Sequence, residues 1–221
     1  MADVTDFMLF LEGNIGAGKS SFLKLLGEDL DCRIVFEPHQ RWQSLQGDQN
    51  LLELFYKSPE RWAYTFETYT LLTRLIDQEP FRSLEDHRMV INERSPYSGW
   101  YCFAQNTHAQ GCMNSLEWGL YQSLCKHLLH QYAIAPTGFI YLKTDPEICL
   151  QRLQKRDRHE ESNMPLSYLE QIHDQHESWL SQESTIPVLT LDGNLPYLDD
   201  LAARDHLVQL VSRFFGVGKK S

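Results

Sequence analysis

The sequence has no apolar run near the roughly 18 residues that a membrane-spanning helix needs, and it has no internal repeat or low-complexity linker. Its five cysteines are odd in number and form no Cys-x-x-Cys pair, so neither a disulfide framework nor a zinc site is indicated. Residues 1–6 are acidic and lack the basic or Arg- and Ser-rich character of a targeting segment. We therefore expect a cytoplasmic protein that starts at Met1 and has no membrane partner.

Positive charge is also scarce. The chain has 20 Lys and Arg against 30 Asp and Glu, a net charge of −10, whereas binding to DNA requires Lys and Arg to neutralise phosphates. This balance argues against a nucleic-acid polymer as partner, and any phosphate must be bound in a local basic pocket. With 221 residues, of which 42% are hydrophobic, the chain can bury a core without staples. We expect a single domain over residues 1–221.

The hydrophobic pattern predicts an α/β fold. Five short, mostly unbroken apolar segments are typical of strands buried on both faces of a parallel sheet: 7–12, 33–37, 89–93, 138–144 and 187–192. Between and after them, apolar residues at helical spacing predict helices over 20–30, 59–78, 114–132, 145–156 and 199–215. This alternation predicts a five-stranded parallel sheet flanked by helices, with right-handed crossovers. The surplus of helix between 45 and 135 predicts an additional helical layer.

Residues 13–20 carry the strongest motif. They read Gly-Asn-Ile-Gly-Ala-Gly-Lys-Ser, which matches G-x-x-x-x-G-K-[ST] between a predicted strand and a predicted helix. In such a P-loop, backbone N–H groups surround the phosphates, Lys19 reaches the β and γ phosphates and Ser20 binds Mg²⁺. The alternative is a glycine-rich turn, but a chance match in this context is rare. The sequence has no Asn-Lys-x-Asp and no Asp-x-x-Gly, which weakens the GTPase interpretation.

Three arginines follow the fourth predicted strand. Arg152 and Arg156 share one helix face because they are four residues apart, and Arg158 precedes the polar run His159-Glu160-Glu161. They could form a solvated basic face. They could also form a lid whose guanidinium groups neutralise charge on a transferring phosphoryl group, and we favour the lid.

Two carboxylates follow predicted strands. Glu37 precedes Pro38 after the second strand, and Glu93 precedes Arg94 after the third. Ligands of open α/β sheets bind at the carboxyl ends of the strands, where the P-loop also lies. One carboxylate can take a proton from a hydroxyl nucleophile while the other helps to hold Mg²⁺. Arg94 either forms an ion pair with Glu93 or holds the nucleophile and the transferred group.

Together these segments resemble the deoxynucleoside kinase family. The matching segments lie in the family's order over about residues 7–193: 13–21, Glu37-Pro38 with Trp42, 51–56, 59–69, Glu93-Arg94-Ser95 and 152–161. The resemblance implies a P-loop kinase fold with a short arginine-rich lid, ATP as phosphate donor, Mg²⁺ as cofactor and a deoxynucleoside as acceptor. It also implies a homodimer built on helices outside the site.

The resemblance further assigns roles. It implies that Glu37 is the general base for the 5′-hydroxyl, that Arg94 positions this hydroxyl and the phosphoryl group, and that Lys19 acts on the phosphates. By the same match, Ser20 and Glu93 would serve Mg²⁺. The residues expected to bind ATP are Gly13, Asn14, Ile15, Gly16, Ala17, Gly18, Lys19, Ser20, Ser21, Arg152, Arg156, Arg158 and Asp192. Those expected to bind the nucleoside are Glu37, Trp42, Leu52, Phe55, Tyr56, Phe66, Glu67, Arg74, Arg94, Gly99, Phe103 and Glu161, with Tyr56 and Glu161 at the 3′-hydroxyl.

Two of these positions depart from the family. Glu67 stands where the family has a Gln that reads the base edge, and Gly99 stands where an Asp holds the equivalent of Arg74. An ionised Glu offers only acceptors, which match guanine, whereas a buried and protonated Glu would mimic Gln. Because a nearby Arg74 opposes protonation, we expect an ionised Glu67 and improved acceptance of deoxyguanosine.

The leading function is therefore ATP-dependent phosphorylation of the 5′-hydroxyl of a deoxyribonucleoside, of purine or cytosine type rather than thymidine-specific. A nucleoside monophosphate kinase of thymidylate kinase type is the alternative. Its acceptor needs extra cations near the base pocket, whereas a nucleoside needs a carboxylate base, and Glu37 favours the nucleoside. A non-catalytic P-loop subunit is more remote, since Lys19, Ser20 and both carboxylates are present.

Overall fold

The computed structural model describes residues 8–45, 49–82, 88–183 and 185–220. Residues 1–6, from which we predicted the start of the chain, lie outside this part. Five strands form one sheet in the order β2-β3-β1-β4-β5, and every neighbouring pair is parallel, which confirms the predicted sheet. The strands are β1 (Met8–Glu12), β2 (Cys32–Val35), β3 (Met89–Glu93), β4 (Gly138–Lys143) and β5 (Val188–Asp192).

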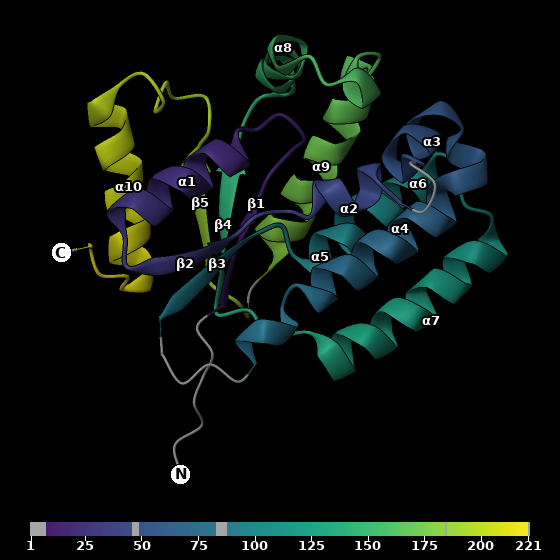
Figure 1. The fold of residues 1–221 in the computed structure, drawn as a ribbon, viewed down its shortest axis with the longest axis horizontal. Coiled ribbons are helices and arrows are strands. Elements are labelled where there is room, and N and C mark those ends of the chain that lie inside the picture. Colours follow the sequence, from purple (N-terminus) through teal and green to yellow (C-terminus); the bar gives the residue numbers. More distant parts are fainter. Residues whose placement is uncertain (1–7, 46–48, 83–87, 184, 221) are drawn as a thin grey trace.

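Helices flank the sheet and form the additional layer that the sequence predicts (Figure 1). Their bounds are α1 (Lys19–Asp29), α2 (His39–Gln43), α3 (Leu51–Lys57), α4 (Pro59–Ile76), α5 (Pro96–Ser98), α6 (Gln105–Ala109), α7 (Ser115–Tyr132), α8 (Pro146–Arg156), α9 (Leu166–Gln182) and α10 (Leu201–Phe215). Three short turns, η1 (Glu79–Phe81), the π-helical η2 (Gly99–Ala104) and η3 (His159–Glu161), complete the described elements. Among the described helices, none combines the length and the apolarity that a membrane span requires.

Local chemistry sets several boundaries. Pro59 starts α4, where its fixed φ is favourable and its missing N–H removes no hydrogen bond. Asn114 begins α7 with a capping box, because its side chain accepts from Glu117 N while the Glu117 carboxylate accepts from Asn114 N. Strand β2 ends at Val35 rather than at Glu37 as predicted. This earlier end places Glu37 in the segment between the sheet and α2.

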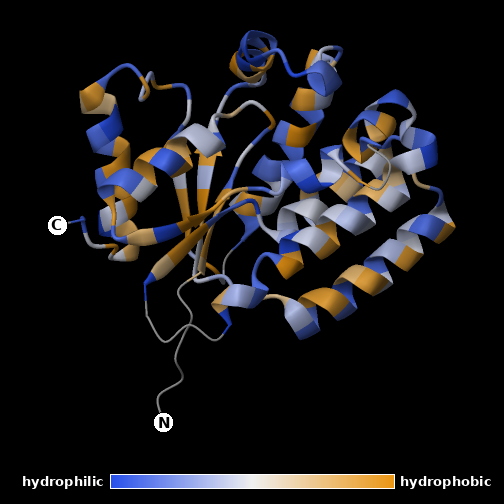
Figure 2. Cartoon of the chain, viewed as in Figure 1, coloured by the Kyte–Doolittle hydropathy of each residue, from blue (hydrophilic) through white to orange (hydrophobic). Residues whose placement is uncertain are grey.

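The sheet is buried on both faces by different helices, and orange apolar residues cover its strands in Figure 2. On one face, Leu9 and Ile91 pack in a cluster with Phe22 of α1 and Val211 of α10. On the other face, the cluster includes Phe10 and Phe139 with Leu180 of α9. A third cluster, with Leu71 of α4 and Tyr121 of α7, holds the helical layer together.

The sequence analysis did not predict α9. Its buried residues are Leu169, Ile172, His176 and Leu180, at spacings of three and four. That periodicity is the signal that would have found it.

Candidate functional site

The P-loop joins the central strand β1 to α1, so the phosphate site lies at the carboxyl end of the sheet (Figure 1). Gly16 and Gly18 have φ of +79° and +97°, a region that favours glycine. A Cβ atom on Gly16 would lie 2.5 Å from the Cys149 carbonyl oxygen, and one on Gly18 would lie 2.3 Å from the Tyr197 hydroxyl. A larger residue at Gly16 or Gly18 would therefore clash with its neighbours.

Other loop residues fix its position. The Asn14 amide donates to the Leu169 carbonyl of α9 at 2.8 Å and its side-chain oxygen accepts from Ile15 N. Lys19 is 5% exposed and donates to the carbonyl oxygens of Gly13 and Asn14 at 3.2 and 2.7 Å. Burial, reinforced by the positive charge of Arg94, lowers the pKa of Lys19 to about 7. These two hydrogen bonds hold the side-chain nitrogen of Lys19 at the mouth of the loop.

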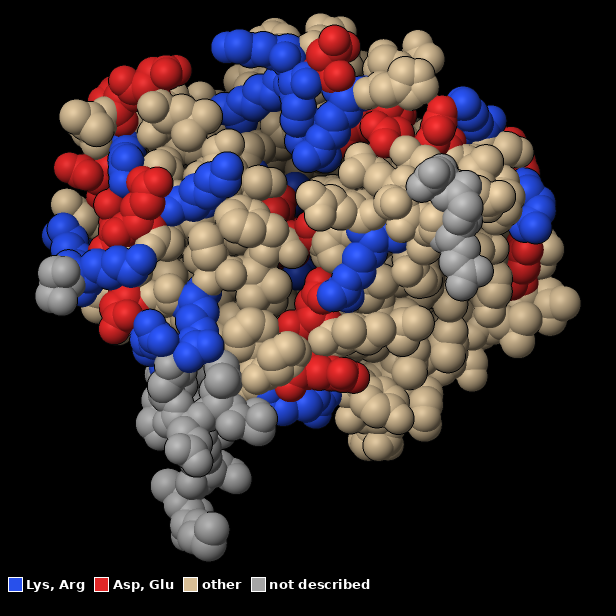
Figure 3. Space-filling view, in the orientation of Figure 1, with Lys and Arg blue, Asp and Glu red and all other residues tan. Residues whose placement is uncertain are grey.

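A cavity extends from the P-loop into the helical layer and encloses about 630 Å³ of space, counting the solvent at its mouth. Figure 3 shows a hollow between the sheet half and the helical half of the molecule, with Lys and Arg side chains gathered on its upper rim, where Figure 1 places α8. Many of the predicted residues line this cavity: Ile15, Gly16, Lys19, Ser20, Glu37, Trp42, Leu52, Phe55, Tyr56, Phe66, Glu67, Arg74, Glu93, Arg94, Phe103, Arg156 and Glu161.

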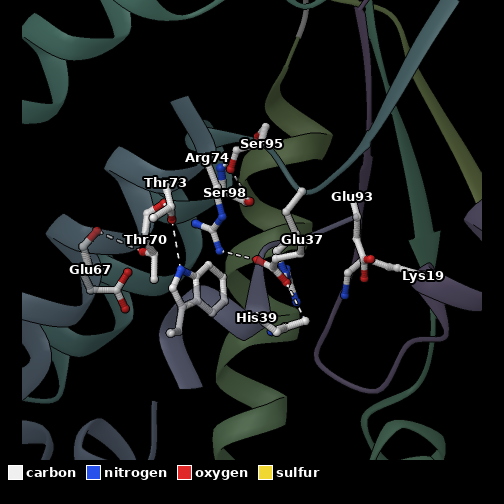
Figure 4. A network of polar contacts seen from close by, with 12 residues as sticks. Lys19, Glu37, His39, Glu67, Thr70, Thr73, Arg74, Glu93, Ser95 and Ser98 are labelled. Atoms are coloured by element: carbon white, nitrogen blue, oxygen red, sulfur yellow. Dashed lines mark hydrogen bonds and ion pairs between the residues drawn. The ribbon is translucent and has the colours of Figure 1, made fainter. Parts of the chain in front are cut away.

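Glu37 pairs with two arginines in this cavity, and Figure 4 shows one of them, Arg74, pointing at the Glu37 carboxylate. Its carboxylate accepts from Arg74 Nη2 at 2.6 Å and from Arg94 Nε at 3.2 Å, and all three side chains are at most 7% exposed. Burial alone would raise the pKa of Glu37, but the charges of Arg94, Arg74 and His39 outweigh burial and hold this pKa well below its ordinary value. Glu37 is therefore an ionised carboxylate throughout the physiological range, and Arg94 pairs with it rather than with its neighbour Glu93.

Arg94 has a strained backbone, with φ of +64°. Its N–H donates to the Leu11 carbonyl at 3.0 Å, and the next N–H, of Ser95, donates to the Glu12 carboxylate at 2.8 Å. Glu12 is fully buried at the end of β1, and burial raises its pKa. It fixes the turn that aims Arg94 at Glu37. The sequence analysis missed this role, although a charged residue closing an apolar strand just before the P-loop was a usable signal.

Ser20 and Glu93 meet at the edge of the P-loop. The Ser20 hydroxyl donates to Glu93 Oε1 at 2.7 Å. Possible ligand atoms of Glu37, His39 and Glu93 also lie within 4.8 Å of one another. Mg²⁺ prefers oxygen ligands, however, and Glu37 is engaged by its arginines. The Ser20 hydroxyl and the Glu93 carboxylate therefore offer oxygen atoms that suit Mg²⁺.

Aromatic side chains form the walls at the far end of the cavity. Phe55 and Phe66 stack with ring centroids 4.6 Å apart, and Trp42 meets Phe66 edge-on at 5.8 Å. The Trp42 indole N–H donates to Thr73 Oγ1 at 3.0 Å, which fixes the ring. Phe103 lies under the Arg94 guanidinium, 4.6 Å from ring centroid to Cζ. Trp42, Phe55 and Phe66 belong both to the core of the helical layer and to the lining of the cavity.

The arginines after β4 divide into two groups. Arg156 contacts Glu161, and Arg158 Nη1 lies 3.7 Å from the same carboxylate, which is 4% exposed. Arg156 and Glu161 line the cavity together with Tyr56. Arg152 instead donates to the carbonyl oxygens of Ala17 and Gly193 at 2.8 and 2.9 Å.

Arg152 therefore ties the P-loop to the segment after β5. Asp192, at the end of β5, accepts from Asn194 N at 2.9 Å, and the Asn194 side chain accepts from Asp145 N at 3.0 Å. Neither Arg152 nor Asp192 lines the cavity.

The expectation for Glu67 is wrong in one respect. Arg74, which was expected to keep Glu67 ionised, donates to Glu37, and burial raises the pKa of Glu67 to about 8 despite the opposing charges of Arg74 and Arg94. Gly99 does not line the cavity but lies behind Arg74. A Cβ atom on Gly99 would be 2.9 Å from Arg74 Nη1.

Three further lining residues were missed: His39, Thr70 and Tyr168. Thr70 lies one turn after Glu67 on α4, and its hydroxyl donates to the Glu67 carbonyl at 3.0 Å. Its helical spacing from Glu67 was the available signal. Tyr168 belongs to α9, which was not predicted, and His39 carried no signal beyond its closeness to Glu37.

Comparisons with known proteins show the family of the chain. The model of the deoxynucleoside kinase family matches residues 9–215. A mitochondrial deoxyguanosine kinase of Xenopus laevis is 37% identical, with 93% of this chain and 88% of the relative covered. The deoxycytidine kinase of Homo sapiens is 37% identical with 92% and 89% covered, and a probable deoxycytidine kinase of fowlpox virus is 38% identical with 86% and 80% covered. The chain belongs to the deoxynucleoside kinase family.

Proposed function

We propose that this enzyme transfers the γ-phosphoryl group of ATP to the 5′-hydroxyl of a deoxyribonucleoside with a purine or cytosine base. The observation that carries the proposal is the ionised Glu37, held by Arg74 and Arg94 in a cavity that opens on the P-loop. A hydroxyl group bound beside Glu37 would face the γ-phosphate held by Lys19. The deoxycytidine and deoxyguanosine kinases among the relatives support the choice of base class.

In this proposal Glu37 accepts a hydrogen bond from the 5′-hydroxyl and receives its proton as the phosphoryl group transfers. The low pKa of Glu37 makes it a weak base. A weak base is sufficient because phosphoryl transfer passes through a loose transition state in which catalysis consists mainly of positioning and charge stabilisation. Arg94 holds the hydroxyl and the transferring group, while Lys19 neutralises charge on the β and γ phosphates.

The lid arginine has a related task. Arg156 lines the cavity and contacts Glu161. Its guanidinium group can neutralise the equatorial oxygens of the transferring group, while Glu161 and Tyr56 bind the 3′-hydroxyl. Arg158, which also pairs with Glu161, helps to hold this side chain in place. Arg152 and Asp192 act indirectly. Arg152 fixes the P-loop and the segment after β5, and Asp192 holds that segment, which would lie beside the base of ATP.

Mg²⁺ would be held by the Ser20 hydroxyl and the Glu93 carboxylate, whose oxygens lie 2.7 Å apart. When bound, the ion neutralises charge on the β and γ phosphates. Ser20 lies in the first turn of α1, directly after the P-loop, and Glu93 is the last residue of β3, so both side chains stand on fixed elements.

The base would lie between the aromatic walls formed by Trp42, Phe66 and Phe103, with Leu52 and Phe55 behind them. Stacking on such rings is tolerant of base identity. Discrimination among bases therefore depends on the polar residues at this end, Glu67 and Arg74.

A nucleoside monophosphate kinase and a non-catalytic subunit are not favoured. An acceptor that already carries a phosphate would place this anion beside Glu37 and Glu93, and the two nearest guanidinium groups are already paired with Glu37. A structural subunit does not require Lys19, Ser20, Glu37 and Glu93 to converge on one cavity, as they do here.

We also propose that two copies pair through α4 and α7. Leu72 and Ile76 of α4 are 43% and 38% exposed, and Leu116 and Leu120 of α7 are 72% and 51% exposed. The two helices pack together (Figures 1 and 2), and none of these four exposed residues lines the cavity. Pairing of α4 and α7 across a dimer would cover this apolar surface. Analytical ultracentrifugation of the parent and of Leu120→Glu tests this proposal. A dimer that the substitution dissociates supports it, and a monomeric parent contradicts it.

We propose a cytoplasmic location and one functional domain over residues 1–221. All five cysteines are free, and four of them are buried, which suits a reducing compartment. Cell fractionation tests the location.

The experiment that tests the proposed reaction incubates the protein with ATP, Mg²⁺ and each of the four natural deoxynucleosides or thymidylate. The products are separated by chromatography and identified by mass spectrometry. Formation of a 5′-monophosphate from deoxycytidine or a purine deoxynucleoside supports the proposal. Phosphorylation of thymidylate alone, or no turnover on any nucleoside, contradicts it.

A further inference from the structure

Glu67 is a buried carboxyl group at the aromatic end of the cavity, where the proposed function places the base. It lies on α4, is 1% exposed, and its Oε1 atom has no hydrogen-bond partner among the described residues. In Figure 4 it stands apart from the ion pair of Glu37 and Arg74, and the line that joins it to Thr70 leaves from its backbone carbonyl. An ionised carboxylate in such a place normally requires donors.

Arg74 is the cation best placed to be such a donor, and it is committed elsewhere. Its Nη2 atom lies 2.6 Å from Glu37, which is itself shared with Arg94. Within the described part of the chain, the remaining Nε and Nη1 atoms of Arg74 have no hydrogen-bond partner, so neither donates to Glu67. The guanidinium charge of Arg74 therefore pairs with the carboxylate of Glu37 and not with that of Glu67.

The other groups that face Glu67 come from several elements. Arg94 follows β3 and its charge favours ionisation, whereas Glu37, before α2, opposes ionisation. Tyr121 of α7 and Tyr168 of α9 are neutral phenols, because burial raises the pKa of each far above its ordinary value. Burial outweighs the two arginines and raises the pKa of Glu67 to about 8. At neutral pH most Glu67 side chains therefore carry a proton.

A protonated carboxyl group offers one donor and one acceptor, as an amide does. Cytosine presents N3 as acceptor and its 4-amino group as donor, and adenine presents N1 and its 6-amino group in the same order. Guanine instead presents two adjacent donors, N1–H and the 2-amino group, and this pair matches an ionised carboxylate.

We propose that Glu67 selects the base as a neutral carboxylic acid, donating to the ring nitrogen of cytosine or adenine and accepting from the exocyclic amino group. This inference rests on the proposed function and extends it to base choice. It replaces the expectation from the sequence that an ionised Glu67 improves the acceptance of deoxyguanosine. It also makes base choice depend on pH, since loss of the proton converts the donor into a second acceptor suited to guanine.

The test compares kcat/KM for deoxycytidine and deoxyguanosine between about pH 6.5 and 8.5 in the parent protein and in Glu67→Gln. Gln carries the same donor and acceptor but does not titrate, so it is the matched control and also reports any ionisation of the substrates. In the parent we expect deoxycytidine to be preferred at the acid end. The ratio of kcat/KM for deoxycytidine to kcat/KM for deoxyguanosine should fall by about tenfold as the pH rises, because a mispaired polar group replaces the hydrogen bond between Glu67 and cytosine. In Glu67→Gln the ratio should stay constant.

Identical pH profiles for the two proteins, or a parent that prefers deoxyguanosine at the acid end, would overturn the inference. If neither protein phosphorylates any deoxynucleoside, the proposed function itself fails and the inference falls with it.

A second measurement needs only the parent protein. Calorimetric titrations at neutral pH, repeated in buffers of different ionisation enthalpy, count the protons exchanged on binding. Deoxyguanosine should release a proton as Glu67 ionises, and deoxycytidine should not. Equal proton counts for the two nucleosides would contradict the inference even if the variant failed to fold.

Discussion

Glu37→Gln removes the negative charge that lies 2.6 and 3.2 Å from Arg74 and Arg94. Gln has nearly the same shape, so the cavity keeps its form and only the charge and the proton acceptor are lost. A positioned acid or base contributes about 10²- to 10⁴-fold to the rate. Because its low pKa makes Glu37 a weak base, we expect the lower end of this range. The kcat should fall about 10²-fold while the KM for the nucleoside changes little.

The same substitution should destabilise the protein, because it leaves two buried guanidinium groups without a counter-ion. Removing one partner of a buried ion pair costs about 3–5 kcal/mol, and we expect the lower end since the Gln oxygen still accepts a hydrogen bond. The pKa of Glu37 in the folded state lies well below the ordinary value of a glutamate, 4.5. Its stabilising contribution is therefore complete above this value and decreases as the pH falls toward the folded-state pKa. The stability difference between parent and variant should narrow below about pH 4.5.

Steady-state kinetics with ATP and deoxycytidine measure the first effect, and urea unfolding followed by tryptophan fluorescence measures the second. Glu28→Gln is the control, since Glu28 is an exposed carboxylate of α1 that pairs with Arg204 far from the cavity. It should leave kcat unchanged and alter stability by less than about 1 kcal/mol. A folded Glu37→Gln protein with kcat within about threefold of the parent would refute Glu37 as the base.

Three other predictions follow from the same geometry. Lys19→Ala should abolish turnover at saturating ATP. ATP binding to the parent at about pH 8 should take up a proton, because phosphate raises the pKa of Lys19 from about 7. Calorimetry in two buffers measures this uptake, and its absence would contradict the prediction. Arg156→Ala should lower kcat more than it weakens nucleoside affinity, whereas equal losses would indicate a plain substrate contact. Glu12→Ala should lower kcat about tenfold or more by releasing the Ser95 N–H and the Arg94 turn, while Glu12→Gln, which retains an acceptor, should be nearly neutral; equal kinetics for the two variants would exclude this positioning role.

The fold was predictable because its signals are local. Unbroken apolar runs such as β4 indicate a strand covered on both faces, and the glycine pattern before Lys19 fits only a loop that closes tightly on phosphate. Helix α9 was not predicted, because the polar residues between Leu169, Ile172 and His176 obscured their helical spacing.

The partners of buried charges were harder to predict, because they depend on distances across the fold. Arg74 and Glu67 are two helical turns apart on α4, so sequence spacing suggests that they pair. Arg74 instead reaches Glu37, which is 37 residues away in the chain. The burial of Glu67, which decides its protonation, is likewise a property of the packed helical layer. The position of Glu12 at the end of an apolar strand marks it as unusual, but its partner, the Ser95 N–H, lies 83 residues away in the chain and is set by the fold.

A crystal structure of the protein with deoxycytidine and ADP tests the central claim most directly. The account predicts that the 5′-oxygen lies within hydrogen-bond distance, about 2.6–3.2 Å, of the Glu37 carboxylate. It also predicts that the base lies among Trp42, Phe66 and Phe103, and that the β-phosphate of ADP lies at Lys19. A nucleoside bound outside this cavity, or bound with its 5′-hydroxyl turned away from Glu37, would contradict the account.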